Sequence, residues 1–266
     1  MAAAKTARHP ASQVEAYVLH RYDWSESSLI LDLFTRERGR VAVAAKGAKR
    51  PHSQLRAVLL PFQRVQVTLG RASGDEQAEV HTLRHAEWAG GGPMLAGSAL
   101  FSGFYLNELL MKLLARHDPH PVLFDAYRAT LPALGSGHEG LAQAGLRAFE
   151  LLLLRETGLL PDLATVTLTQ RPVDAAGRYQ LVPESGVVAA LGDAPGLPGS
   201  LLLGQQAALD QGDAAALRAA CASAGAALRV GLRTLLHYHL GTPSLRTRQV
   251  MQSVQRLIDS TPTPSR

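Results

Sequence analysis

The chain has 266 residues, of which 46% are hydrophobic, and a formal net charge of +5. This length suits one large domain or two ordinary ones. The single cysteine, Cys221, excludes an intramolecular disulfide and a zinc site of clustered cysteines. The N-terminus lacks the apolar core of a signal peptide, and no apolar run approaches the roughly 20 residues of a membrane span. We therefore expect a cytoplasmic protein with no membrane contact.

Residues 14–86 follow a small, polar leader, 1–13, that we expect to be disordered. Five short segments in this region have strand character: 14–20, 29–34, 40–45, 62–69 and 78–86. In the fourth, Val65, Val67 and Leu69 alternate with polar residues. Five short strands without helical crossovers predict a small antiparallel barrel, for which an OB-fold is the natural candidate.

The pattern from Leu95 onward has the period of helices, and we expect an α-helical domain over residues 87–258. Helices are predicted over 95–117, 122–134, 141–157 and 244–258, the last of them basic. The strongest stripe has spacings of 4, 3, 4, 4, 3 and 4 and predicts one helix of about six turns: Leu217, Cys221, Ala224, Leu228, Leu232, Leu235 and His239.

Two stretches interrupt or follow this helical pattern. Residues 160–203 contain several prolines and glycines and predict an irregular insertion with a short β-hairpin. Residues 259–266 are expected to form a disordered tail. The fold class is therefore α+β, with an N-terminal OB-fold barrel followed by a mainly helical domain.

Positive charge is concentrated in the predicted barrel. Residues 36–71 contain nine Arg or Lys against one acid, a net charge of +8 in a chain of +5, so that the remainder sums to −3. A dense basic surface on a sheet neutralises phosphates and releases condensed counterions. A nucleic-acid-binding domain is the first hypothesis, and a solvated basic face that only aids solubility is the alternative.

The loop AKGAKRPHS, 45–53, is the most specific local signal, because it combines Gly47 with several donors after a strand. Ammonium, guanidinium and backbone N–H groups together can hold phosphates there. Trp24 and Tyr22, in a polar loop beside Arg21, are candidates for stacking on bases. The predicted nucleic-acid contacts are Arg21, Trp24, Arg36, Arg38, Arg40, Lys46, Lys49, Arg50, Arg56 and Arg64.

Nothing in the sequence argues for catalysis. There is no HExxH, CxxC or GxSxG motif, so we expect no metal, no cofactor and no enzyme activity. Glu108 lies among leucines and could be a buried carboxylate, but an interface or solvated position on an amphipathic helix is the favoured interpretation.

The run from Tyr17 to Phe62 resembles the N-terminal domain of the bacterial DNA repair protein RecO family. WSESS, LDLFT, GRV, AKGAKR, S-x-L and LLPF occur there in that order. The resemblance continues through YLNELL at 105–110, LRAFELLLLRETG at 146–158 and HLGTPSLRTRQVM at 239–251, and so covers nearly the whole chain.

The resemblance implies a recombination mediator that binds single- and double-stranded DNA. Such a protein anneals complementary strands and helps to load RecA onto strands coated by single-strand-binding protein. Its implied partners are the acidic C-terminal tail of that coating protein and RecR. Many family members have a four-cysteine zinc motif after the helix ending near Gly158, which is absent from this chain. Zinc is therefore not carried over.

An acidic tail with an apolar end would suit an apolar helical groove with a cation at its mouth. Arg147, and with it Lys112 or Arg116, could supply that cation, although Arg147 could equally make an ion pair along a surface helix. A rival hypothesis from another class is an OB-fold RNA-binding factor, which would prefer structured RNA to single-stranded DNA.

Overall fold

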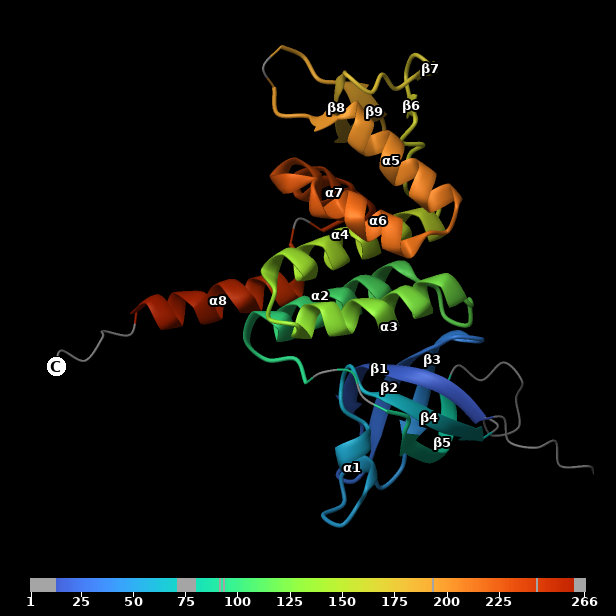
Figure 1. Ribbon diagram of the computed structural model, residues 1–266. Coiled ribbons are helices and arrows are strands. Elements are labelled where there is room, and N and C mark those ends of the chain that lie inside the picture. Colours follow the sequence, from blue (N-terminus) through green and yellow to red (C-terminus); the bar gives the residue numbers. More distant parts are fainter. Residues whose placement is uncertain are drawn as a thin grey trace, which may run out of the picture. The chain divides into compact units, whose positions relative to one another are not determined.

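The computed structural model describes residues 13–70 and 80–260, apart from 91, 93, 193 and 243 (Figure 1). The chain divides into two compact units, which we describe separately. The barrel unit comprises Met1–Gly92 and Ala115–Pro121, and the helical unit comprises Pro93–Leu114 and Val122–Arg266. The expected disorder of the leader and tail falls largely outside the described residues. Of the residues expected to be disordered, the structure describes Gln13, which begins a strand, and residues 259–260, which end the last helix.

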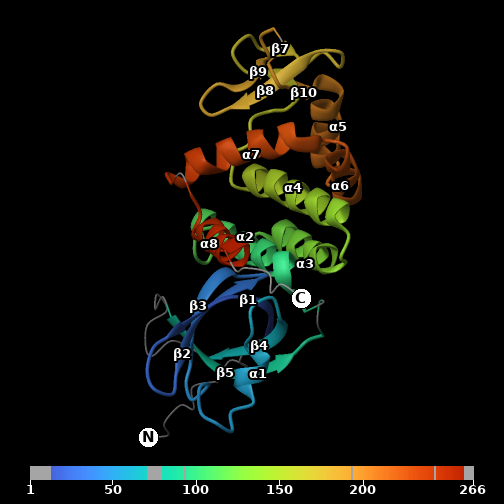
Figure 2. The same ribbon diagram turned by 90° about the vertical axis from the view of Figure 1, so that its left-hand side faces the viewer.

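Five strands form a closed barrel in the order β1-β2-β3-β5-β4. They are β1 (Gln13–Asp23), β2 (Leu29–Thr35), β3 (Gly39–Ala45), β4 (Arg64–Gly70) and β5 (Val80–Trp88). Figure 2 shows these strands curling into a ring. The predicted OB-fold barrel is confirmed, with β1 and β5 extending two or three residues past their expected ends.

One pair of neighbours in the barrel is parallel. Strands β3 and β5 are parallel, whereas β1–β2, β2–β3, β1–β4 and β4–β5 are antiparallel. A closed ring with an odd number of strands cannot have only antiparallel neighbours, so the expectation of a purely antiparallel barrel is wrong at this one seam.

The barrel interior is filled by the alternating apolar residues that the sequence pattern predicted. Val65 and Val67 are fully buried, and Leu69 is 5% exposed. The short helix α1 (Leu55–Val58) packs Leu55 and Val58 against this core. Burial of aliphatic side chains on both the strands and α1 is the main force that holds the barrel closed.

The β2–β3 turn packs against the segment 115–121. Gly39 has φ +62°, and a Cβ atom there would lie 1.9 Å from the carbonyl oxygen of Asp118. The N–H of His117 donates to the carbonyl of Arg40 at 2.9 Å. Glycine is needed at position 39 because both the backbone angle and the close approach exclude a side chain.

The helical unit begins with three long helices, α2 (Gly97–Leu113), α3 (Pro121–Gly135) and α4 (Glu139–Glu156). Helix α4 ends at a left-handed Gly158, with φ +71°, as its sequence predicted. Helix α2 ends earlier than predicted, because Leu114 is extended and Arg116 forms an isolated β-bridge with Arg40. Residues 115–117 therefore belong to the barrel unit.

The predicted six-turn helix is broken in two. Helices α6 (Ala214–Ala222) and α7 (Gly225–Leu240) meet at a bend of 117°. Gly225 adopts φ +61°, which glycine allows without strain. Both helices pack on α4, so their buried residues keep a helical spacing across the break. The sequence pattern therefore gives no sign that the helix is interrupted.

Between α4 and α6 lie small sheets and one helix. Strands β8 (Arg178–Val182) and β9 (Gly186–Ala189) form the predicted hairpin, and β10 (Leu197–Pro198) adds a third strand. The remaining elements are β6 (Thr165–Val166), β7 (Arg171–Pro172) and α5 (Gly199–Asp210), and the chain closes with α8 (Arg246–Ser260). The insertion is thus more regular than expected, and it ends at α5.

Within the described residues, no single helix is long and apolar enough to cross a membrane. Helices α6 and α7 reach that length and composition only when taken together, and they are sharply bent.

Candidate nucleic-acid interface

Most of the basic residues of the barrel unit lie in turns and loops rather than on strands. Of the nine in residues 36–71, only Arg40 and Arg64 are on strands, and Arg71 lies outside the described residues. The others are Arg36 and Arg38 in the β2–β3 turn, Lys46, Lys49 and Arg50 in the β3–α1 loop, and Arg56 in α1. The expectation that this charge is concentrated on the sheet is therefore wrong for most of these residues.

Arg40 is buried and neutralised. Its Nη2 lies 3.5 Å from Oδ1 of Asp32, and the side chains of the two residues are 9% and 4% exposed. The other carboxylate oxygen of Asp32 lies 3.7 Å from Nη2 of Arg116, which is half-exposed. Arg40 does not lie on an exposed face as expected, because a buried cation is stable only beside a carboxylate.

Arg64 and Arg21 are half-buried and hold chain segments together. Arg64 Nη1 lies 3.2 Å from Oε1 of Glu15, and its Nη2 donates to the carbonyl of Ala89 at 2.5 Å. Arg21 Nη1 donates to the carbonyl of Leu59 at 3.3 Å. The geometry gives both guanidinium groups a structural role, joining β1 and β4 to the segments beside them.

Lys49 joins two loops at one end of the barrel. Its Nζ donates to the carbonyl of Ser25 at 3.0 Å and lies 3.2 Å from Oδ1 of Asp23. Its backbone N–H donates to the carbonyl of Ser27, also at 3.0 Å. Lys49 therefore joins the β1–β2 turn to the β3–α1 loop. Its ammonium group is paired with Asp23 and is less available to a ligand.

This fastening brings together the exposed groups of both loops, which we call the loop end of the barrel. It contains Trp24, 58% exposed, from the β1–β2 turn, and Lys46 and Arg50 from the β3–α1 loop. The N–H of Arg50 donates to the carbonyl of Gly47, whose φ of +74° makes the turn. Two cations and an indole ring can contact a phosphate backbone and a base together.

Tyr22 lies near this end of β1 and is 45% exposed. Its ring lies 4.4 Å from that of His20, edge to face. Burial of part of the side chain, and the nearby charge of Asp32, raise the pKa of Tyr22. Tyr22 and Trp24 are therefore available for stacking, whereas the aromatic side chains of Phe34 and Phe62 are buried in the barrel.

The opposite end of β2 and β3 carries a second basic group, which we call the turn end. Thr35 pairs with Gly39 there, whereas Leu29 pairs with Ala45 at the loop end. The turn end comprises Arg36, Arg38 and Arg116. A strand of seven residues such as β3 spans about 20 Å, so the loop and turn ends are separate surfaces.

The three predicted tail-binding cations are divided between the two units. Arg116 belongs to the barrel unit, and Lys112 on α2 lies 3.8 Å from Glu108, one helical turn earlier. Arg147 is only 9% exposed, and its Nη2 lies 2.8 Å from Oε1 of Glu150. Arg147 thus makes an ion pair along its helix, but in a buried setting rather than on the surface.

Glu150 is the charged residue that sequence reasoning missed. It is fully buried and accepts a hydrogen bond from the Tyr105 hydroxyl at 2.7 Å. Burial raises the pKa of Glu150, although Arg147 and Tyr105 oppose this effect. Burial also raises the pKa of the nearby Cys221 thiol, to about 12. The signal for Glu150 was its position inside the run FELLLL.

Glu108 is also buried, at the contact between α2 and α8. Of the favoured interpretation, an interface or a solvated position, the interface is confirmed and the solvated position is wrong. Its carboxylate accepts from the backbone N–H groups of Arg246 and Thr247, both at 2.9 Å, and from the Thr247 hydroxyl at 2.7 Å. Burial alone would raise the pKa of Glu108, but these bonds and Lys112 outweigh it and lower the pKa. Glu108 therefore caps the first turn of α8.

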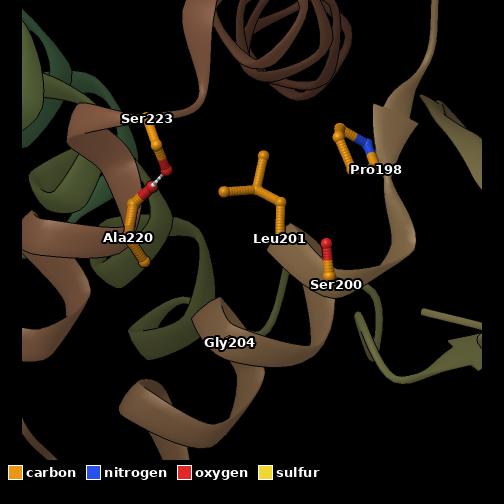
Figure 3. Close-up of a pocket in the computed structure, with 6 residues that line it drawn as sticks. All are labelled: Pro198, Ser200, Leu201, Gly204, Ala220 and Ser223. Atoms are coloured by element: carbon orange, nitrogen blue, oxygen red, sulfur yellow. Dashed lines mark hydrogen bonds between the residues drawn. The ribbon is translucent and has the colours of Figure 1, made fainter. Parts of the chain in front are cut away.

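The helical unit also has two uncharged hollows. One, of about 370 Å³, lies between α5 and α6, with Leu201 pointing into it and the Ser223 hydroxyl bonded to the Ala220 carbonyl (Figure 3). The other, of about 440 Å³, lies between α7 and the β8–β10 sheet. Neither has a charged lining residue, and the described residues contain no cluster of three possible metal ligands.

Comparison with known proteins places both units in one family. Residues 10–90 match the family model described as Recombination protein O N terminal, and residues 94–249 match Recombination protein O C terminal. The chain is 54% identical to DNA repair protein RecO of Verminephrobacter eiseniae over 246 residues, which cover 91% of this chain and 96% of the relative.

Two further relatives match over almost their full lengths. The chain is 52% identical over 261 residues to DNA repair protein RecO of Variovorax paradoxus, covering 94% of this chain and 99% of the relative. It is also 52% identical over 270 residues to the protein of that name from Acidovorax ebreus, covering 97% and 100%. The chain therefore belongs to the RecO family, whose curated members named here are called DNA repair proteins.

Proposed function

We propose that this protein is a mediator of DNA repair and homologous recombination. It binds single- and double-stranded DNA, anneals complementary strands, and helps to load RecA onto strands coated by single-strand-binding protein. The observation that carries the proposal is the loop end of the OB barrel, where Lys46, Arg50 and Trp24 are exposed. Membership of the RecO family supports it.

The mechanism needs no covalent chemistry, and we propose that the protein is not an enzyme. Cations that hold two strands by their phosphates reduce the repulsion between them and release condensed counterions. The base edges stay free to pair because the protein contacts the phosphates and not the edges of the bases. Stacking on Trp24 would add about 1–3 kcal/mol per base to the affinity for single strands.

The proposal extends to two protein partners, the acidic tail of the single-strand-binding protein and RecR, and to a cytoplasmic, nucleoid-associated location. Among the predicted tail contacts, Arg147 and Lys112 lie in the helical unit. Arg147 is held by Glu150, so a tail carboxylate would have to share this guanidinium.

The central experiment compares a loop-end variant with a variant of matched charge. Lys46→Glu with Arg50→Glu should weaken binding of fluorescein-labelled single-stranded DNA in anisotropy titrations over a salt series. It should also flatten the dependence of affinity on salt by about 0.7 for each lost phosphate contact. Strand annealing should slow in parallel. Matched RNA and duplex competitors test the RNA-binding alternative.

The control is Arg171→Glu with Arg218→Glu, which removes the same charge from β7 and α6 in the helical unit. Equal losses in the two variants would show that only net charge matters and would contradict the loop-end assignment. Lys49→Gln is analysed separately by thermal unfolding, because Lys49 fastens two loops. Absence of DNA binding by the wild-type protein at low salt would refute the proposed function.

The tail contact has its own test. Arg147→Ala and Lys112→Ala are titrated with a synthetic peptide carrying the acidic, apolar C-terminus of a single-strand-binding protein. Arg147→Ala should reduce the peptide affinity at least tenfold if its guanidinium contacts the tail. Unchanged affinity in a folded Arg147→Ala variant would remove Arg147 from the site.

A further inference from the structure

Helix α7 carries a row of basic side chains along one face, two arginines and a histidine. Arg229, Arg233 and His237 are spaced four residues apart, so that each lies about 6 Å along the axis from the one before. Arg229 is exposed, and the other two are half-buried. Arg248, in the first turn of α8, lies near the C-terminal part of this row. Figure 2 shows the chain leading from the end of α7 to α8.

The row is not neutralised. Among the residues described, none of Arg229, Arg233 and Arg248 forms an ion pair with a carboxylate. Two carboxylates accept hydrogen bonds from tyrosine hydroxyl groups, Glu150 from Tyr105 and Glu184 from Tyr238 of α7. Glu150 is moreover fully buried beside Arg147.

The positive charges in this row oppose the protonation of their neighbours. Burial and the charges of Arg248 and Arg229 lower the pKa of Arg233. Burial and the charges of Arg248 and Arg233 lower the pKa of His237. In the described part of the chain, the only carboxylate whose charge is felt by this row is Glu150, near Arg233, and it is buried and already paired with Arg147. Like charges gathered with so little counter-charge reduce stability, and such a cluster is typical of a site that receives an anion.

We propose that Arg229, Arg233 and His237 of α7, together with Arg248 of α8, bind consecutive phosphates of a nucleic-acid strand. The guanidinium groups present paired donors that match phosphate oxygens, and the regular spacing of the row suits a polymer with one charge per nucleotide. This inference rests on the proposed function. It assigns one DNA strand to the helical unit and a second DNA strand to the barrel.

The test uses the full-length protein with Arg229→Gln and Arg233→Gln combined. The control, Arg171→Gln with Arg218→Gln, removes the same charge from other elements of the helical unit. For labelled single-stranded DNA, the salt slope should fall by about 1.4 in the α7 variant, or 0.7 for each lost contact, and remain unchanged in the control. Annealing should slow several-fold in the α7 variant alone.

A local measurement distinguishes phosphate binding from a structural effect. The imidazole of His237, followed by NMR with His237→Gln for assignment, should show a rise in pKa when an oligothymidylate is added. An unchanged pKa at saturating oligonucleotide overturns the proposal. So does a rise produced by an acidic peptide but not by the oligonucleotide.

The outcomes separate this inference from the proposed function. If the wild-type protein binds no DNA, both fail. If it binds DNA and the loop-end variant loses binding, but the α7 variant matches its control in slope and annealing, only this inference fails. Should Arg233→Gln prevent folding through its proximity to Glu150, Arg229→Gln with Arg248→Gln gives the same test without altering that contact.

Discussion

The barrel unit and the helical unit neutralise their buried arginines in different ways. Asp32 lies opposite Ala42 on the neighbouring strand and reaches diagonally to Arg40. In the helical unit, Arg147 meets Glu150 three residues later on the same helix. A partner at i+3 can be found in the sequence, whereas a diagonal partner depends on strand register.

The two units also differ in which basic side chains are paired with carboxylates and which are not. In the barrel, the strand arginines Arg40 and Arg64 are paired with carboxylates, and most of the exposed positive charge of residues 36–70 lies in turns and loops. In the helical unit, Arg147 and Lys112 are paired along their helices, while the α7 row is not. Counting charges in a sequence therefore overstates a binding surface unless the carboxylates that reach each cation are known.

The largest expected effect comes from breaking the helical pair. Glu150→Ala should lower the free energy of unfolding by about 4 kcal/mol, because it leaves the Arg147 cation buried without a counter-charge. Urea denaturation measures the loss. The double variant Arg147→Met with Glu150→Leu should regain most of it, since apolar side chains can replace a buried pair. A double variant as unstable as the single one would contradict this account.

A smaller loss is expected when the diagonal pairs are broken. Asp32→Asn should cost about 3 kcal/mol, because Arg40 is buried and Arg116 shares the same carboxylate. Glu15→Gln is the matched variant at the half-exposed Arg64 pair and should cost less than about 1 kcal/mol. Equal costs in urea denaturation would show that burial does not decide the strength of these pairs.

The smallest effect concerns the cap that Glu108 provides for α8. Glu108→Gln should cost about 1 kcal/mol, as is usual for a lost helix cap, and should speed proteolysis within α8. Hydrogen bonds lower the pKa of Glu108 from 4.5, so its contribution is complete above pH 4.5. That contribution should disappear as the pH falls through the lowered pKa, and the variant should lack this part of the pH dependence.

Some functional groups could be predicted because they depend on local sequence. Lys46 and Arg50 follow a strand and flank Gly47, and they are exposed in a turn as expected. Trp24 lies in a polar turn for the same reason. The hydrogen bonds of Lys49 to the β1–β2 turn could not be predicted, because they join residues 24 positions apart.

The sequence by itself determined the kind of the five barrel strands and of the longer helices α2, α3, α4 and α8, and which residues of the barrel strands and of α2 face the core. Alternating residues such as Val65 and Val67 fill the barrel, and leucines at helical spacing fill the helical unit. These patterns follow from the two backbone periods and the burial of apolar surface. The RecO-like motifs identified the family for the same reason, since they are local runs of residues.

Only the tertiary structure decided where charge remains available. Strands β2 and β3 pair over their length and so place Arg36 and Arg38 at one end and Lys46 and Arg50 at the other. The segment 115–121 packs on the β2–β3 turn and adds Arg116 to the turn end. The stripe of buried residues that packs on α4 gives no sign of the break before Gly225. Helix α8 packs on α2 and carries Arg248, which lies near Arg233 of α7. The physical reason is that an electrostatic interaction depends on distance and burial, which the fold sets between residues far apart in the chain.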